Sequence, residues 1–396
     1  MEPLLPQGPK EQMAKLTCAI LQKSGALSAQ IPSSRVRLRA AQLVSEMNSY
    51  YSNLIEGHKT LPRDIERALK SDFSANEQQR DNQYLSKAHI EVEGLMLERL
   101  RNERDLSIHS FEFLSWLHRE FFQRLPEHMQ WGESKSGKKC RIAPGALRHY
   151  EVDVGRHQPP AQESLPGFLA RFDSFYSSKD ILPTEQMVAL SAAHHRLSWI
   201  HPFGDGNGRI IRLYSHAWIV RLGIDSFGLW TLSRGLARRR QAYFSSLAIA
   251  DQTRWNDLDG RGNLSDRGLS QFCVFMLETM LDQIEFMTGL FEFEQLATRI
   301  ERFLHFEKTK LAARDRERLY RLLKAALVEG EIERGRASEI LGLQSTAARK
   351  IVRLALSERL LDSPTEKGPL SLVFSADTLD SYFPKLFQDL PSIAEG

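Results

Sequence analysis

Cysteine is scarce in this sequence: 396 residues include only Cys18, Cys140 and Cys273. They are widely separated and form no CxxC pair, which argues against a disulfide scaffold or a cysteine zinc site and fits a reducing compartment. Long apolar runs are also missing, since no stretch approaches the roughly 20 residues of a membrane span. The start of the chain lacks the basic segment and apolar run of a secretory signal. We therefore expect a cytoplasmic protein with no membrane partner.

No charge of one sign dominates the chain. Lys and Arg number 53 against 50 Asp and Glu, which leaves a formal net charge of +3. So small an excess does not by itself indicate a nucleic-acid binder. Apolar residues make up 42% and charged residues 26% of the chain, which is ordinary for a globular protein of two or three domains.

Strand-like segments are scarce, and helical periodicity covers most of the chain. Apolar residues recur at three- and four-residue spacing in the segments 35–56, 76–101, 109–124, 163–177, 184–200, 209–222, 234–250 and 266–305. The clearest alternating segment, 148–154, follows the turn-prone residues 132–146 and is expected to form one arm of a hairpin. These patterns predict a mainly α-helical fold with one hairpin on a helical body.

After residue 310 the pattern changes. Residues 337–353 are typical of a helix, a glycine turn and a second helix, with Ser345 as the expected N-cap. Two short apolar segments around a turn at 367–369 follow, as in a β-wing. This order predicts a C-terminal winged helix-turn-helix domain over 306–396.

The predicted second helix of that domain carries Arg349, Lys350 and Arg353, which indicates DNA as a partner. However, residues 310–396 contain 14 Lys and Arg against 13 Asp and Glu. That balance provides little of the charge that drives nucleic-acid binding. A role in protein interaction or dimerisation is therefore an open alternative.

The most informative stretch is residues 199–212, which contains three alternating glycines between a histidine and two arginines. Pro202 ends the apolar helix before it, and a second helix is expected to begin near Gly208. The free N–H groups of its first turn, with the helix dipole, form an anion site that glycines let a phosphate approach. Arg209 and Arg212 share one helix face and match phosphate oxygens.

Two further side chains of this stretch add chemistry. Asp205 is a carboxylate that can hold Mg²⁺ beside phosphate oxygens. His201 has a side-chain pKa suited to removing a hydroxyl proton. No Lys-Ser/Thr pair follows the last glycine, so the stretch is not a Walker A loop. We interpret it as a triphosphate site with a base beside it.

These residues match the HPFxDGNGRxxR motif of the Fic family at each defined position, and the chain resembles that family over roughly residues 35–255. The resemblance implies a Fic-type helical core with a hairpin flap. It also implies a protein adenylyltransferase, which moves AMP from ATP to a Ser, Thr or Tyr hydroxyl of a target protein and releases pyrophosphate. ATP is then the substrate, and Mg²⁺ is the cofactor.

The resemblance also implies a role for each residue of the motif. His201 is the general base, and Asp205 holds Mg²⁺. Arg209 and Arg212 neutralise the β- and γ-phosphates. The α-phosphate is cradled by Gly206, Asn207 and Gly208.

Two other segments resemble parts of the same family. Residues 144–160 resemble the flap, which borders the nucleotide at Val154 and Gly155 and docks the target by strand pairing. An ordinary surface hairpin is the plain alternative. Tyr243 resembles the aromatic residue beside the adenine, with Asp251 towards the ribose, although an aromatic at helical spacing is more often a core residue.

Residues 52–57 match the family's inhibitory motif, [S/T]xxxE[G/N], and Ser52 and Glu56 share one helix face. In the family this glutamate pairs with the second arginine of the motif, here Arg212, and displaces the γ-phosphate. The resemblance therefore implies auto-inhibition by Glu56. In some members the same glutamate positions water for de-AMPylation, so the reverse reaction stays open.

Two basic clusters have plainer interpretations. His194 and His195 point about 100° apart on a helix and do not form the i, i+4 pair of a zinc helix. They are expected to pack or to make polar contacts. Arg234 and residues 238–240 are expected to form a solvated helix face.

We predict four segments: an N-terminal helical region with the inhibitory helix (1–108), a Fic core (109–255), a helical connector (256–305) and the winged-helix domain (306–396). The alternative function is a transcription regulator whose nucleotide site only senses ATP; an intact His201 favours the enzyme. Some family members transfer UMP or phosphocholine, so the donor stays open. The target protein and a homodimer also stay open.

Overall fold

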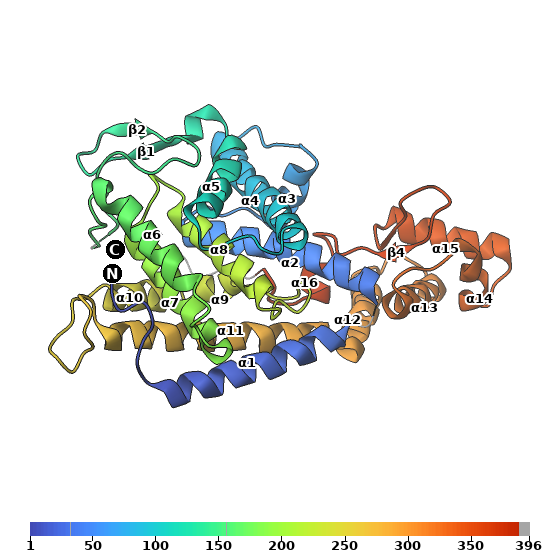
Figure 1. Ribbon diagram of the computed structural model, residues 1–396. Coiled ribbons are helices and arrows are strands. Elements are labelled where there is room, and N and C mark those ends of the chain that lie inside the picture. Colours follow the sequence, from blue (N-terminus) through green and yellow to red (C-terminus); the bar gives the residue numbers. More distant parts are fainter. Residues whose placement is uncertain (32, 156, 388–396) are drawn as a thin grey trace. The chain divides into compact units, whose positions relative to one another are not determined.

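The structure is a computed structural model that describes residues 1–31, 33–155 and 157–387. It is mainly helical, as predicted (Figure 1). The α-helices are α1 (Lys10–Gln30), α2 (Ser34–Ile55), α3 (Pro62–Leu69), α4 (Glu77–Asn102), α5 (Phe111–Gln123), α6 (Leu165–Tyr176), α7 (Gln186–Ile200), α8 (Asn207–Arg221), α9 (Leu232–Arg238), α10 (Arg240–Ala250), α11 (Asp266–Phe291), α12 (Phe293–Phe306), α13 (Ala313–Glu329), α14 (Ala337–Leu341), α15 (Ser345–Ser357) and α16 (Leu379–Tyr382). The strands are β1 (Trp131–Glu133), β2 (Lys139–Arg141), β3 (Leu361–Asp362) and β4 (Ser371–Leu372), and a short 3₁₀ helix, η1, covers Glu127–Met129.

Helices occupy each of the eight segments in which the sequence predicts them, but two of these segments contain a break. Segment 234–250 is divided at Arg239 into α9 and α10. Segment 266–305 is divided at Glu292, whose carboxylate caps α12 by accepting hydrogen bonds from two backbone N–H groups of its first turn. Glutamate is not among the preferred N-cap residues, so the sequence contains no ordinary start signal for α12.

Helix α1 lies outside the predicted segments. Its buried side chains have helical spacing: Met13, Thr17, Ile20, Ser24 and Leu27. Two of the five are polar, so they interrupt the apolar periodicity from which a helix is predicted.

The chain forms two compact units. The first, here called the core unit, comprises residues 1–23, 48–225 and 231–283, and the second comprises 24–47, 226–230 and 284–396. In the core unit, α7 and α8 run side by side and are buried along nearly their whole length, with α4 and α5 against α8 and α6 against α7 (Figure 1). The division into the four segments 1–108, 109–255, 256–305 and 306–396 stays a prediction.

The core unit has a β-hairpin, but it lies earlier in the chain than expected. Strands β1 and β2 pair antiparallel with Trp131 opposite Arg141, within the segment that the sequence marks as turn-prone. Residues 148–154, the expected arm, form no regular strand, and only an isolated bridge joins Val154 to His157. Arg148 in this segment is buried and bonds to backbone carbonyls, so the segment is attached to the chain at 201–202. It is also attached to the β1–β2 turn, where the Lys135 N–H donates to the Glu151 carbonyl at 2.7 Å.

In the second unit, α14 and α15 are joined by a turn at Gly342, which has left-handed backbone angles (φ 61°, ψ 39°), and β3 pairs with β4. The predicted order of helix, glycine turn, helix and hairpin is therefore present. Helix α15 begins at Ser345, with Gln344 in the N-cap position where Ser345 was expected. Residues 388–396, which end the predicted winged-helix segment, lie outside the described residues.

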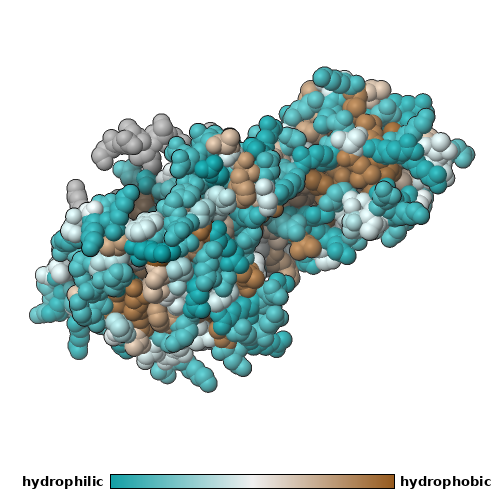
Figure 2. All heavy atoms as spheres, turned by 90° about the horizontal axis from the view of Figure 1, so that it is seen from above, coloured by the Kyte–Doolittle hydropathy of each residue, from teal (hydrophilic) through white to brown (hydrophobic). Residues whose placement is uncertain are grey.

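The surface in Figure 2 is mostly hydrophilic and is interrupted by smaller apolar areas. Within the described residues, no helix combines the length and apolar character needed to cross a membrane. Cys18 is exposed, Cys140 is half-buried and Cys273 is buried, and all three are free thiols. The expectation of no disulfide scaffold agrees with this finding.

Candidate active site

His201 lies where α7 ends. Its backbone is left-handed (φ 48°, ψ 63°), and its N–H donates to the Leu197 carbonyl at 3.1 Å. Burial, together with the charges of His157 and Arg148, lowers the pKa of His201 to about 4. The imidazole is therefore neutral at neutral pH and can accept a proton. Its buried Nδ1 has no partner of normal hydrogen-bond geometry among the described residues, although the nearby Ser198 carbonyl partly opposes the fall in pKa.

The His201 side chain lines a cleft of about 540 Å³. Four parts of the core unit line it: the end of α2, the β1–β2 hairpin with η1, the segment before His157, and the motif. The lining residues are Glu56, His128, Trp131, Gly132, Glu133, Lys139, Val152, Asp153, Val154, His201, Gly204, Asp205, Gly206, Asn207 and Gly208. The cleft thus joins segments that are up to about 150 residues apart in sequence.

The motif loop (residues 201–206) is shaped by its own side chains. Asn207 accepts from the Phe203 N–H at 3.0 Å and donates to the Phe203 carbonyl at 2.8 Å. Gly206 takes left-handed angles (φ 76°, ψ 2°) as the N-cap of α8, and its N–H donates to Asp205 Oδ1 at 2.6 Å. The first turn of α8 therefore opens directly into the cleft, and its free N–H groups form an anion site there.

His118, on α5, packs against this loop, and its ring stacks on that of Phe203. It is fully buried, and its Nδ1 accepts from the Gly145 N–H at 2.8 Å. The ring proton is therefore on Nε2, which lies 3.3 Å from the Asp205 carbonyl. Burial lowers the pKa of His118 to about 3, so the ring stays neutral and keeps this arrangement. No local pattern in the sequence marks this histidine as part of the site, because a histidine on an apolar helix resembles a core residue.

The structure brings the two arginines of the motif against α2. Both are buried, and Arg212 donates from Nε to Ser52 Oγ at 2.9 Å and from a terminal nitrogen to Glu56 Oε1 at 2.7 Å. Arg209 donates to the Asn53 side chain at 3.0 Å. Burial would raise the pKa of Glu56, but the charges of Arg212 and Arg209 and the hydrogen bond from Arg212 together outweigh it, so the net pKa lies below its ordinary value. Glu56 therefore stays ionised at neutral pH.

Glu56 also occupies space at the start of α8. A Cβ atom added to Gly208 would clash with the Glu56 carboxylate oxygen. The carboxylate thus lies against the first turn of the helix, in the place where an external anion would approach. It lines the cleft with about a third of its side chain (32%) facing solvent.

The basic cluster on α9 and α10 differs from its prediction. Arg234 is fully buried and donates to the Gln283 side chain at 3.1 Å, so the expected solvated face is wrong at this position. Arg240 donates to the Ile55 carbonyl at 3.0 Å, at the end of α2, where a cation is favourable to the helix dipole. Arg240 therefore supports the end of α2, the helix that carries Ser52 and nearly reaches Glu56.

Val154 lines the cleft, whereas Gly155 is not among its lining residues. Tyr243 is buried, and its hydroxyl lies 2.8 Å from His194 Nε2, so it does not line the cleft. Its place beside an adenine remains a prediction. Asp251 approaches His195 Nε2 at 3.1 Å, and the adjacent histidines make polar contacts in the core, as expected.

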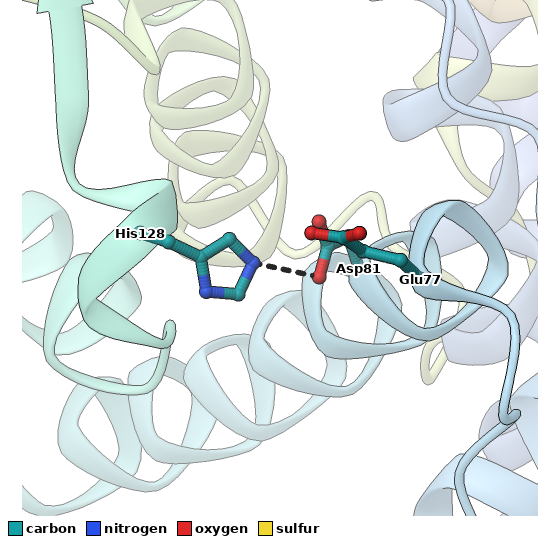
Figure 3. Close-up of side chains that lie close together, drawn as sticks. All are labelled: Glu77, Asp81 and His128. Carbon is teal, nitrogen blue, oxygen red and sulfur yellow. Dashed lines mark hydrogen bonds and ion pairs between the residues drawn. The ribbon is translucent and has the colours of Figure 1, made fainter.

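One group of side chains among the described residues has the spacing of metal ligands: Glu77, Asp81 and His128 (Figure 3). His128 Nε2 lies 2.9 Å from Asp81 Oδ1. Both acids lie at the start of α4, where the helix dipole favours a carboxylate and opposes a cation. A hydrogen bond that ties η1, and with it the cleft wall, to α4 accounts for this geometry. In the cleft, the exposed Asp205 fits Mg²⁺, which needs only one or two protein carboxylates beside phosphate oxygens.

Comparison with known proteins finds a family match over part of the core unit. The Fic/DOC family matches residues 108–218. The protein adenylyltransferase Fic of Aedes aegypti is 31% identical over 111 residues, covering 28% of this chain and 21% of the relative. The corresponding protein of Nematostella vectensis is 43% identical over 81 residues, covering 20% and 18%. The chain thus spans about a fifth of the length of these curated relatives.

A solved structure extends the likeness in fold beyond the matched residues. The crystal structure of a Fic family protein from Desulfovibrio desulfuricans G20 covers 94% of this chain and 98% of its own, with a TM-score of 0.54 and 16% identity. At that identity the likeness shows a shared fold.

Proposed function

We propose that this chain, whose residues 108–218 belong to the Fic/DOC family, transfers AMP from ATP to a hydroxyl group of a protein. The observation that carries the proposal is the cleft, in which the neutral imidazole of His201 lies beside the open first turn of α8. That pairing provides a base and an anion site in one cavity. The names of the curated relatives agree with this chemistry.

The reaction needs one proton acceptor and a site for a polyphosphate. The hydroxyl oxygen of the target attacks the α-phosphorus, and its proton passes to His201. The bond from the α-phosphorus to the oxygen shared with the β-phosphorus breaks, and pyrophosphate leaves. The N–H groups of Asn207 and Gly208 stabilise charge on the α-phosphate, and Arg209 with Arg212 does so on the leaving phosphates. Asp205 would hold Mg²⁺, which supplies further charge neutralisation when bound.

The same geometry supports auto-inhibition. Glu56 lies 2.7 Å from Arg212 and against Gly208, so a terminal phosphate and this carboxylate compete for one guanidinium and one helix turn. Since the pKa of Glu56 is lowered, the competition persists at neutral pH. The wild-type chain is therefore held in a state of low activity.

The proposal is tested with Glu56→Gly protein incubated with ATP and Mg²⁺ in a cell extract. Peptide mass spectrometry is expected to find an AMP adduct on a Ser, Thr or Tyr side chain. The Glu56→Gly/His201→Ala protein is the control and should produce none. Adducts of another nucleotide would redefine the donor, and the absence of any adduct with a folded protein would refute the transferase.

A second candidate function, DNA binding, rests on the second unit. Arg349, Lys350 and Arg353 lie on the exposed side of α15, and none of them pairs with an acid in the part of the chain that the structure describes. The opposite side of α15 is buried through Ala348 and Ile351. Three unpaired cations on a helix that follows a tight turn suit phosphate and base-edge contacts, as in a winged helix.

The expected result is a salt-dependent affinity of the full chain for a fluorescein-labelled 20-base-pair duplex, measured by anisotropy. Replacing Arg349, Lys350 and Arg353 with alanine should lower the slope of log K against log salt by about 2 to 3, since each phosphate contact contributes about 0.9. The matched control replaces the exposed Lys10, Lys179 and Lys310, which should leave the slope unchanged. Equal slopes in both triple variants would leave protein interaction as the role of this unit.

A further inference from the structure

Arg148 is an arginine whose charged group lies entirely inside the core unit. Its side chain is 0% exposed. An ionised guanidinium in such a place is costly unless its N–H groups are all used. Here the guanidinium donates to three backbone carbonyls: Nε to His201 at 2.9 Å, one terminal nitrogen to Tyr150 at 3.2 Å and the other to Pro160. Its charge is also paired, since a terminal nitrogen lies 3.7 Å from a carboxylate oxygen of Glu151.

The contacts of Arg148 join two segments that the reaction must bring together. Its side chain connects Tyr150 and Pro160, both in the segment 144–160 that resembles the flap, to the carbonyl of His201. Its own backbone N–H donates to the Pro202 carbonyl at 2.9 Å, which is a second link to the same loop. His201 has unusual left-handed angles, and Arg148 bonds to the carbonyl whose direction those angles set.

We propose that Arg148 is a positioning residue for His201: it fixes the backbone at the base and holds the base and the flap as one body. The proposal rests on the proposed AMP transfer. A hydroxyl that arrives on the flap then meets the imidazole at a set distance, because both are attached to the same guanidinium. Misplacement of reacting groups by about 1 Å can cost about 10²-fold in rate.

A planar guanidinium fork is required for this role. Lysine has the charge, but a single ammonium cannot reach three carbonyls that are arranged around a planar group. Glutamine has neither the charge nor the fork. The two substitutions therefore separate the geometric effect of Arg148 from its electrostatic effect on His201, whose pKa its charge lowers.

The experiment compares Glu56→Gly protein with Glu56→Gly/Arg148→Lys and Glu56→Gly/Arg148→Gln. Pyrophosphate release is measured at saturating target or, before a target is known, as self-modification. Both double variants should lose about 10- to 100-fold in kcat, while KM for ATP changes less than about threefold. Arg101→Gln in the same background is the matched control, since Arg101 is an exposed arginine of α4 that does not line the cleft, and it should leave kcat unchanged.

The pH profile separates positioning from simple loss of structure. Without the charge of Arg148 the pKa of His201 rises, so a larger fraction of the base is protonated at low pH. The acid limb of log kcat should therefore move to higher pH in Arg148→Gln and stay in place in Arg148→Lys. Rates are normalised to the folded fraction from thermal unfolding, and Arg148→Lys alone decides if Arg148→Gln does not fold.

Two failures are distinguishable in this design. If Glu56→Gly protein itself has no transferase activity, the proposed function fails. If it is active and the Arg148→Lys variant retains its kcat, the positioning role is overturned. A fall in ATP affinity with unchanged kcat would also overturn it, because it would place Arg148 in nucleotide binding.

Discussion

Replacing Glu56 with glycine should raise the rate of AMP transfer by about 10- to 100-fold. The carboxylate makes a charge-assisted hydrogen bond to Arg212 at 2.7 Å and lies against the first turn of α8. Hydrogen bonds to charged groups contribute about 1.5–3 kcal/mol, and each 1.4 kcal/mol corresponds to about tenfold. Because Glu56 is about one-third exposed (32%), its contribution lies towards the lower end of that range. Glycine costs little helix stability here, since α2 ends at Ile55.

Two variants control for the chemistry of this substitution. Glu56→Gln keeps the shape but loses the charge, so its rate should rise less than that of Glu56→Gly. Ser52→Ala removes one hydrogen-bond acceptor of Arg212 and leaves the carboxylate, so a rise of about threefold or less is expected. The measurement is initial pyrophosphate release at several ATP concentrations. Equal rates for wild type and Glu56→Gly, with equal ATP affinity, would contradict inhibition by this contact.

The chemistry of the cleft was predictable from sequence where the residues that carry it lie close together in the chain. The motif at 201–212 holds a base, a carboxylate, glycines and arginines in one continuous stretch, and each has a chemical role that depends on residue type. Ser52 and Glu56 are one helix turn apart, so their common face follows from helical geometry. The mainly helical fold was predictable for the same reason, because the apolar spacing that defines a helix is local.

The supports of the site were not predictable, because they depend on contacts between distant residues. Arg148 reaches a carbonyl 53 residues away, and His118 reaches one 87 residues away. Neither residue has a local sequence pattern that marks its role. From sequence, Arg148 would be interpreted as a surface cation and His118 as a core aromatic residue. The hairpin was misplaced because residues 148–154 alternate between inward-facing and exposed side chains, as in a strand, but form no regular strand.

The resemblance predicts that Tyr243 lies beside an adenine, but its side chain is buried in this structure. Its hydroxyl lies on His194, whose other ring nitrogen is 2.7 Å from Ser215 Oγ. Because Ser215 donates its proton to the Ile211 carbonyl, His194 must donate to Ser215 and accept from Tyr243. Burial raises the pKa of Tyr243 to about 12, so its hydroxyl keeps the proton that this chain of hydrogen bonds needs. In this structure the residue is part of the support behind Arg212.

Removing the base should have the largest effect of all. In the Glu56→Gly background, His201→Ala is expected to lower kcat by about 10²- to 10⁴-fold, the usual contribution of a general base. ATP affinity should change little, because the phosphate contacts come from α8 and not from the imidazole. His305→Ala is the matched control, since His305 is an exposed histidine of α12 that does not line the cleft, and it should retain the parent rate.

The backbone at His201 requires a second substitution. Its left-handed angles (φ 48°, ψ 63°) are unfavourable for alanine by about 1–2 kcal/mol, whereas asparagine adopts them more readily. His201→Asn therefore removes the base with less strain, and it should lose as much activity as His201→Ala while unfolding at a higher temperature. Because the pKa of His201 is lowered to about 4, the active histidine protein should keep its rate between pH 6 and 8 and lose it only as pH falls towards that value. If His201→Asn retained most of the parent rate, the loss in His201→Ala would reflect backbone strain, and His201 would not be the base.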